Sequence, residues 1–221
     1  MLRIGFSFLV ATLVLLSCNK GSGFELKEGD ILFQDLDCGV YCESIETVTL
    51  GYNGANLSHC GIVVMEGGRP HVIEAISKGV SLTALDSFLV RSSDKSGKPK
   101  VLVGRLKKGN EFIVENAIVE SRKHLGKDYD PVYDIENDKM YCSELVYFSF
   151  KDQGEFLFNL NPMTFKALGS DSTFADWQTY FDDLQQPVPE GKPGLNPGSI
   201  SLSDQIEIVY QFGSPDGMEW E

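Results

Sequence analysis

Histidine, positive charge and long apolar runs are scarce in this chain of 221 residues. It contains three histidines and no Cys-x-x-Cys pair, which argues against a structural zinc site. Lysine and arginine number 19 against 32 aspartate and glutamate residues, so the net charge is -13. Phosphate backbones need basic residues to displace their counterions. The acidic balance therefore excludes nucleic acid as a partner, and it disfavours anionic lipid headgroups for the same reason.

The remaining composition is that of an ordinary globular protein. Hydrophobic residues make up 42% of the chain and charged residues 23%, which argues against disorder and against a multi-span membrane protein. A chain of this length can bury one sizeable core, and nothing in its length demands two. We therefore expect a single domain over residues 24–221.

The N-terminus differs from this domain. Arg3 is followed by an apolar run from Ile4 to Leu16, too short for a confident membrane span, and then by Ser17 and Cys18. The segment resembles a lipoprotein signal peptide. That resemblance implies removal of residues 1–17, lipidation of Cys18, a flexible tether over residues 18–23 and a bacterial envelope location, periplasmic or surface-exposed. Loss of Arg3 would change the net charge from -13 to -14. An ordinary secretory signal or a buried helix are the alternatives.

Three of the other cysteines have structural interpretations. Cys38 and Cys42 share one polar segment and could pair in an oxidising envelope. Cys60 directly follows His59, so strand alternation turns its side chain to the opposite face, where we expect a small buried core residue.

Hydrophobic periodicity and turn residues outline an α+β domain with a small antiparallel sheet packed with helices. A helix is expected from an N-cap at Asn110 to a stop at Gly126, another beginning at Cys142, and a third after Thr173. Residues 35–57 and 187–198 are predicted to be loops. Strands are predicted at 30–34, 79–82, 101–106 and 206–212, with a hairpin of 62–65 and 71–75 around Gly67 and Gly68.

Three polar side chains on these elements could form a catalytic triad. Cys142 lies where a polar loop gives way to an apolar helix, and a helix N-terminus lowers the pKa of a thiol. His59 and Glu74 lie on neighbouring strands of the predicted hairpin, close enough to meet. Each residue alone is more often structural, although a buried Glu needs a partner. Together they predict a Cys-His-acid arrangement for nucleophilic catalysis.

Several motifs in order strengthen this interpretation: GDILFQ (29–34), SHCGIVV (58–64), VIEA (72–75), LGKDYD (125–130) and YCSELVYFSF (141–150). They resemble the YiiX-like branch of the NlpC-type papain-like cysteine hydrolases. In this circularly permuted branch the histidine strand precedes the cysteine helix, as it does here. The resemblance covers nearly all of residues 24–212 and implies a permuted papain-like fold.

Carried over to this chain, the resemblance implies Cys142 as nucleophile, His59 as general base and acid, and Glu74 as the residue that orients His59. Tyr129, Gln34 and Tyr141 are candidates for substrate or oxyanion contacts, with simple packing as the alternative for Tyr129 and Gln34. The backbone N–H of Cys142 is the more favoured oxyanion donor. Tyr141 stands where unpermuted members have Asp, and this departure puts a peptidoglycan substrate in doubt.

The expected activity is hydrolysis of an amide bond, peptide or N-acyl, through an acyl-thioester, with no metal or organic cofactor. Hydrolysis or transfer of a fatty-acyl ester or amide is an alternative, since permuted relatives include acyltransferases. The phenylalanines at 148, 150, 156, 158 and 165 would suit an apolar ligand, although such clusters are more often core. A catalytically silent binding module and a purely structural lipoprotein are the remaining alternatives.

Overall fold

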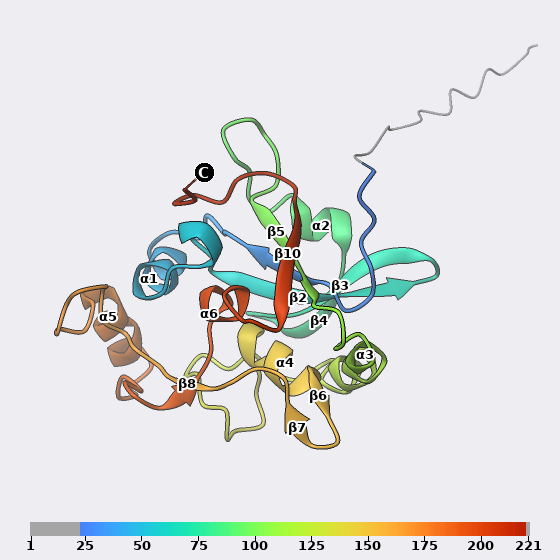
Figure 1. The fold of residues 1–221 in the computed structure, drawn as a ribbon. Coiled ribbons are helices and arrows are strands. Elements are labelled where there is room, and N and C mark those ends of the chain that lie inside the picture. Colours follow the sequence, from blue (N-terminus) through green and yellow to red (C-terminus); the bar gives the residue numbers. More distant parts are fainter. Residues whose placement is uncertain (1–22, 220–221) are drawn as a thin grey trace, which may run out of the picture.

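The computed structural model describes residues 23–219. A six-stranded antiparallel sheet runs through its centre in the order β10-β5-β1-β2-β3-β4 (Figure 1). The strands are β1 (Ile31–Gln34), β2 (His59–Glu66), β3 (Arg69–Ile76), β4 (Gly79–Ala84), β5 (Val101–Leu106) and β10 (Ile206–Gln211). Helices pack against this sheet, so the predicted α+β class is confirmed, and every predicted strand is present.

The β2–β3 hairpin places two of the candidate catalytic residues. Ile62 pairs with Ile73 and Val63 with Val72, and the turn lies at Gly67 and Gly68. Both glycines have positive φ, 56° and 78°, as the tightest hairpin turns require. This register brings Glu74 back alongside the start of β2, where His59 lies.

The two faces of the sheet are covered by different elements because side chains alternate along each strand. Ile31, Phe33 and Ile62 lie in a core cluster with side chains of α3 (Ile113–Lys123) and α4 (Cys142–Ser149). Leu32, Val63 and Val103 form a second cluster with Phe88 of α2 (Leu85–Leu89).

A third cluster, in which most side chains are aromatic, lies beside one end of the sheet. It joins α1 (Val40–Val48) to α5 (Ala175–Asp183), which are neighbours in Figure 1. Trp177 of α5 donates a hydrogen bond to the carbonyl of Ser44 in α1, at 3.1 Å. The remaining elements are short: η1 (Tyr52–Gly54), β6 (Lys151–Asp152), β7 (Glu155–Phe156), β8 (Asn161–Pro162), β9 (Pro193–Gly194) and α6 (Pro197–Ser201).

Three sequence predictions need correction. Residues 35–57 are not a continuous loop, because they contain α1, which is tied at its start by a Cys38–Cys42 disulfide. Helix α3 begins at Ile113 rather than after Asn110; the Asn110 side chain instead donates to Gln205. Residues 187–198 are not only a surface loop, since they include β9 and the start of α6.

The predicted signal peptide, residues 1–17, and the lipidation site Cys18 lie outside the described residues. Within residues 23–219, no helix is long and apolar enough to cross a membrane.

Candidate active site

Cys142 is the first residue of α4, as predicted. Tyr141 precedes it in an extended conformation, and the Tyr141 N–H donates to the Glu144 carboxyl group at 3.1 Å, which closes the first turn. The first N–H groups of a helix have no partner within the helix and carry partial positive charge. The thiol therefore lies where negative charge is favoured. It is 8% exposed and opens into a cavity.

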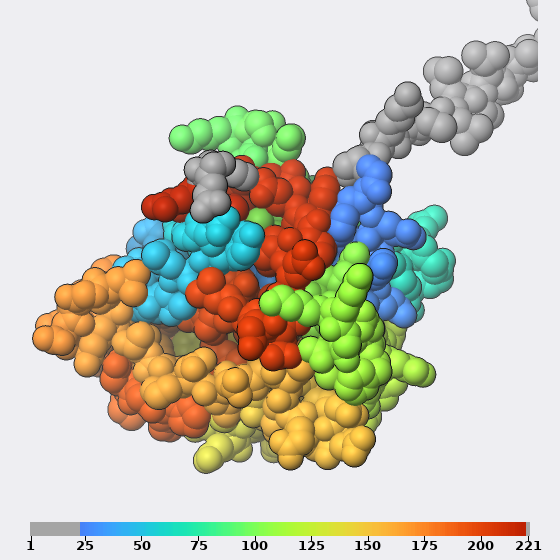
Figure 2. Space-filling view, viewed as in Figure 1, coloured from blue at the N-terminus to red at the C-terminus, as the bar shows by residue number. Residues whose placement is uncertain are grey.

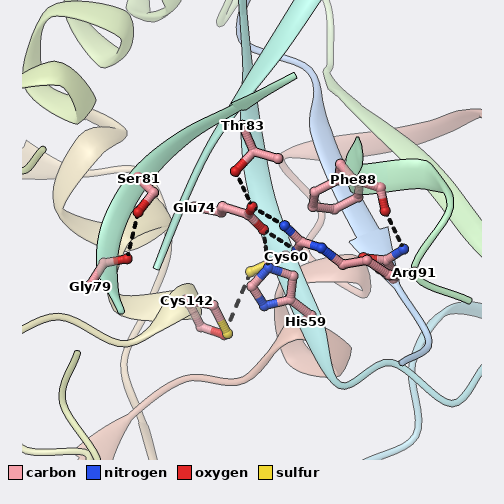
Figure 3. A network of polar contacts seen from close by, with 11 residues as sticks. His59, Cys60, Glu74, Gly79, Ser81, Thr83, Phe88, Arg91 and Cys142 are labelled. Carbon is pink, nitrogen blue, oxygen red and sulfur yellow. Dashed lines mark hydrogen bonds and ion pairs between the residues drawn. The ribbon is translucent and has the colours of Figure 1, made fainter. Parts of the chain in front are cut away.

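His59 and Glu74 form a buried pair beside this thiol. The His59 Nε2 atom lies 2.7 Å from Oε2 of Glu74, and both side chains are buried. Because Nε2 is bound to the carboxylate, Nδ1 is the ring nitrogen left to exchange a proton with the thiol. Figure 3 shows the Cys142 sulfur pointing toward the His59 ring. The three residues proposed from the sequence are thus brought together by β2, β3 and α4.

Glu74 has two further partners that the sequence did not reveal. The two terminal guanidinium nitrogens of Arg91, Nη1 and Nη2, donate to the carboxylate at 2.6 and 2.5 Å, and the Thr83 hydroxyl donates at 2.5 Å (Figure 3). A bidentate arginine is among the strongest partners of a carboxylate. The rule that a buried Glu needs partners was a usable signal, but it names no partner. These contacts fix the carboxylate that orients His59.

The charges of the site reinforce one another. Burial raises the pKa of Glu74, but bonds to His59 and Arg91 outweigh it and lower the pKa to about 2. Burial lowers the pKa of His59, whereas Cys142 and Glu74 favour the imidazolium and raise it to about 9. The pKa of Cys142 lies well below its usual value, because Cys60 and His59 stabilise the thiolate against the effect of burial. These charges therefore favour a thiolate-imidazolium pair at the site.

Cys60 is fully buried in the cluster under α4, as the sequence predicted. The ring of His59 instead lies 5.8 Å from that of Phe88, in the cluster on the other face, so the expected alternation is confirmed. No pattern in the sequence indicated that Cys60 also reaches Cys142, whose thiolate it stabilises.

The three tentative contact residues occupy different places. Tyr129 and Tyr141 line the cavity beside Cys142, and the Tyr141 hydroxyl accepts the Leu195 N–H at 3.3 Å. Gln34 is fully buried, is paired in register with His59 and donates to the Phe88 carbonyl at 2.9 Å. It is not among the cavity-lining residues. The structure thus brings the two tyrosines to the cavity and leaves Gln34 behind the histidine.

The cavity has a volume of about 230 Å³ and mostly apolar walls. In Figure 2 it opens between α1, the segment leading into α6 and residues 161–165. Ile45 and Val48 come from α1, and Met163 and Leu195 from the two later segments. The predicted surface loop 187–198 therefore contributes part of the wall, which the sequence did not show.

Aromatic side chains form much of this wall. Tyr133, Phe165 and Trp177 line the cavity together with the two tyrosines already named. Of the five phenylalanines singled out from the sequence, only Phe165 does so; Phe150 and Phe158 are core residues under α4. For most of the phenylalanines, the core interpretation is the one the structure favours.

One group of carboxylates resembles a cation site. Oxygen atoms of Asp35, Asp37 and Asp216 lie within 4.8 Å of one another. The ammonium of Lys100 lies among them, at 3.1, 2.6 and 3.1 Å. Since the lysine already supplies the positive charge, we interpret this group as an ion-pair network and derive no chemistry from it.

Comparisons with known proteins agree with this fold. The family model of the permuted papain-like amidases, YaeF/YiiX, C92 family, matches residues 25–210. Among individual proteins, the Escherichia coli K12 protein described as "Uncharacterized protein YiiX" is 29% identical over 120 residues. This match spans about half of each protein, 54% of this chain and 54% of the relative.

A solved structure shares the fold. The crystal structure of "metalloprotein yiiX" from Escherichia coli O157:H7 superposes with a TM-score of 0.71 at 22% identity, covering 86% of this chain and 99% of the other. The family model covers most of the chain, and the fold agrees with it. The chain therefore belongs to the C92 family of permuted papain-like amidases.

Proposed function

We propose that this protein cleaves an amide bond, peptide or N-acyl, through a Cys142-His59-Glu74 triad. The observation that carries the proposal is the buried His59–Glu74 pair at 2.7 Å beside a thiol at a helix N-terminus. A catalytic cysteine needs a lowered pKa and a base held in one orientation, and this arrangement supplies both.

The reaction follows from the charges in two stages. The Cys142 thiolate attacks the carbonyl carbon, and the oxygen takes up negative charge at the N-terminus of α4, where the Cys142 N–H is the donor. The His59 imidazolium then protonates the leaving amine as the C–N bond breaks, which leaves an acyl-thioester. Neutral His59 next takes a proton from water, whose oxygen attacks the thioester. The acid leaves, and thiolate and imidazolium are restored.

Glu74 acts through His59 rather than on the substrate. It accepts the Nε2–H bond, stabilises the imidazolium and holds the ring with Nδ1 toward the thiol. Arg91 and Thr83 in turn hold the carboxylate, so we assign both as positioning residues.

A second candidate substrate class is a fatty-acyl ester or amide. The apolar cavity beside Cys142 supports it, because an acyl chain gains free energy when it leaves water for such walls. In either class the acyl part of the substrate lies in the cavity during attack. The amine or alcohol departs toward the opening.

The location of the protein is also a proposal. The sequence from Arg3 to Cys18 favours a lipid anchor in a bacterial envelope, with the domain periplasmic or surface-exposed. The Cys38–Cys42 disulfide is in keeping with an oxidising compartment. Membrane attachment through Cys18 would be lost in a Cys18→Ala variant, as fractionation of cells would show.

The catalytic proposal is tested by profiling the protein with acyl-amide, ester and muropeptide probes. We expect turnover or covalent labelling in the wild type and neither in Cys142→Ala. His59→Ala should lose iodoacetamide labelling of Cys142 near neutral pH, whereas His71→Ala, a change of a half-buried histidine near the start of β3, should not. If Cys142 labels no faster than buried Cys60, the protein is a silent binding module and the proposal is wrong.

A further inference from the structure

Two reduced cysteines meet beside the active site. Cys60 and Cys142 are the free cysteines of the described residues. Their sulfur atoms lie 3.8 and 3.7 Å from the same hydroxyl, that of Ser143. Figure 3 shows both sulfurs beside the His59 ring. The helix start and the strand start thus place two thiols next to each other across the α4–β2 contact.

The two thiols differ in access and in charge. Cys142 opens into the cavity, while Cys60 has no exposed surface. A hydrogen bond from the Cys60 S–H lowers the pKa of Cys142, and burial together with the neighbouring thiolate raises the pKa of Cys60. One is therefore a reachable thiolate and the other a shielded thiol. Hydroperoxides oxidise thiolates rather than thiols, so Cys142 is the cysteine that they oxidise first.

We propose that Cys60 is a resolving cysteine, which converts oxidised Cys142 into a reversible Cys60–Cys142 disulfide. In the first step the Cys142 thiolate attacks a hydroperoxide, the O–O bond breaks, and a sulfenic acid and an alkoxide or hydroxide form. In the second step the Cys60 sulfur attacks the sulfenic sulfur. The S–S bond forms, the S–O bond breaks, and the Cys60 proton leaves with the oxygen as water.

The first step prepares the second. Two of the causes that raise the pKa of Cys60 are its hydrogen bond to Cys142 and the negative charge there. A sulfenic acid is neutral, so both effects end when Cys142 is oxidised. The thiolate partner of the His59 imidazolium is lost at the same moment. Cys60 therefore becomes a better nucleophile only when there is a sulfenic acid to attack.

The disulfide has a clear consequence for the hydrolase. It removes the attacking sulfur and protects it from irreversible oxidation to the sulfinic acid. Because Cys142 borders the cavity, a small thiol can reach the bond and restore both cysteines. The same chain already holds the Cys38–Cys42 disulfide, so an oxidising compartment would expose Cys142 to such chemistry.

The inference rests on the Cys142 thiolate that the proposed function also needs, and the test separates the two. Iodoacetamide labelling of the untreated protein first reports whether Cys142 is reactive. The protein is then treated with hydrogen peroxide, alkylated under denaturing conditions and mapped by peptide mass. We expect one cross-linked peptide pair joining Cys60 to Cys142, a mass lower by two hydrogen atoms, and recovery of labelling after dithiothreitol.

Variants make the result specific. Cys60→Ala should give a dimedone-reactive sulfenic acid that proceeds to a sulfinic acid, with labelling that dithiothreitol does not restore. In Cys142→Ala, Cys60 should stay reduced at the same peroxide dose. A Cys38→Ser, Cys42→Ser double variant lacks the existing disulfide. It should still form the cross-link, because the cross-link joins Cys60 to Cys142. A reactive Cys142 that gains one or two oxygen atoms in the wild type, while Cys60 stays alkylatable, would overturn the inference and leave the hydrolase proposal intact.

Discussion

Replacing Glu74 with glutamine tests the charge network behind the nucleophile. The side chain keeps its shape and an acceptor for His59 but loses its negative charge. The folded-state pKa of Glu74 is about 2 against an ordinary 4.5, which corresponds to about 3 kcal/mol of stability at neutral pH. That stability is fully present above pH 4.5 and is lost as the pH falls toward 2. In the variant it is absent at every pH.

Two readouts follow from this loss. A change of about 3 kcal/mol lowers the melting temperature of a domain of this size by roughly 6–12 °C near pH 7. An opposite charge within hydrogen-bonding distance changes a pKa by about 1–3. The pKa of His59 should therefore fall by that amount when Glu74 loses its charge. The pKa of the Cys142 thiol then rises, and the midpoint of its iodoacetamide labelling moves to higher pH.

Glu66→Gln is the matched control. Glu66 lies at the far end of β2 and pairs with Arg122, and both side chains are more than one-third exposed. Loss of such a pair costs about 0–1 kcal/mol and leaves the thiol unaffected. Two results together would contradict this prediction: Glu74→Gln and Glu66→Gln have the same melting temperature, and iodoacetamide labelling of Glu74→Gln has the pH dependence of the wild type. The Glu74 charge would then neither stabilise the fold nor support His59.

Three further predictions concern the surroundings of the triad. Amide hydrolysis should be constant across neutral pH and fall as the pH rises through about 9, where His59 loses the proton needed by the leaving amine; a fall already near 6.5 would contradict the ion pair. Burial raises the pKa of Glu144 to about 8, so the stability its neutral form contributes is lost as the pH rises through 8. Glu144→Gln should have the melting temperature of the wild type near pH 5 and a higher melting temperature than the wild type at pH 9. The same melting temperature for both proteins at both pH values would contradict this. A Cβ at Gly194 would overlap the Met163 side chain in the cavity wall. Gly194→Ala should therefore slow labelling by long-chain acyl probes but not by iodoacetamide, and equal loss with both would point to misfolding instead.

The sheet and the proximity of Cys142, His59 and Glu74 could be predicted because their signals are local. Val and Ile runs bounded by glycines mark the strands, and the Gly67-Gly68 turn sets the register that brings Glu74 to His59. The start of α4 is visible in the change from polar to apolar residues at Cys142. Each of these signals lies within a few residues of the feature it predicts.

The missed features depend on contacts between distant segments. Helix α1 contains Ile45, Thr47 and Val48, which have modest helix propensity, and it is held by a disulfide and by packing on α5. Arg91 reaches Glu74 only because α2 turns the chain back over the sheet, which no periodicity reports. The cavity wall likewise joins segments from residue 45 to residue 199.

The most direct test of the account is to trap the acyl group on Cys142. The protein is mixed with an excess of an activated acyl ester, quenched in acid within the first turnover and analysed by intact mass and peptide mapping. We expect one acyl group on the peptide that contains Cys142, released by neutral hydroxylamine as a thioester is, and none in Cys142→Ala. Hydrolysis of the ester by Cys142→Ala at the wild-type rate, or an acyl group on another residue, would contradict the assignment of Cys142 as the nucleophile.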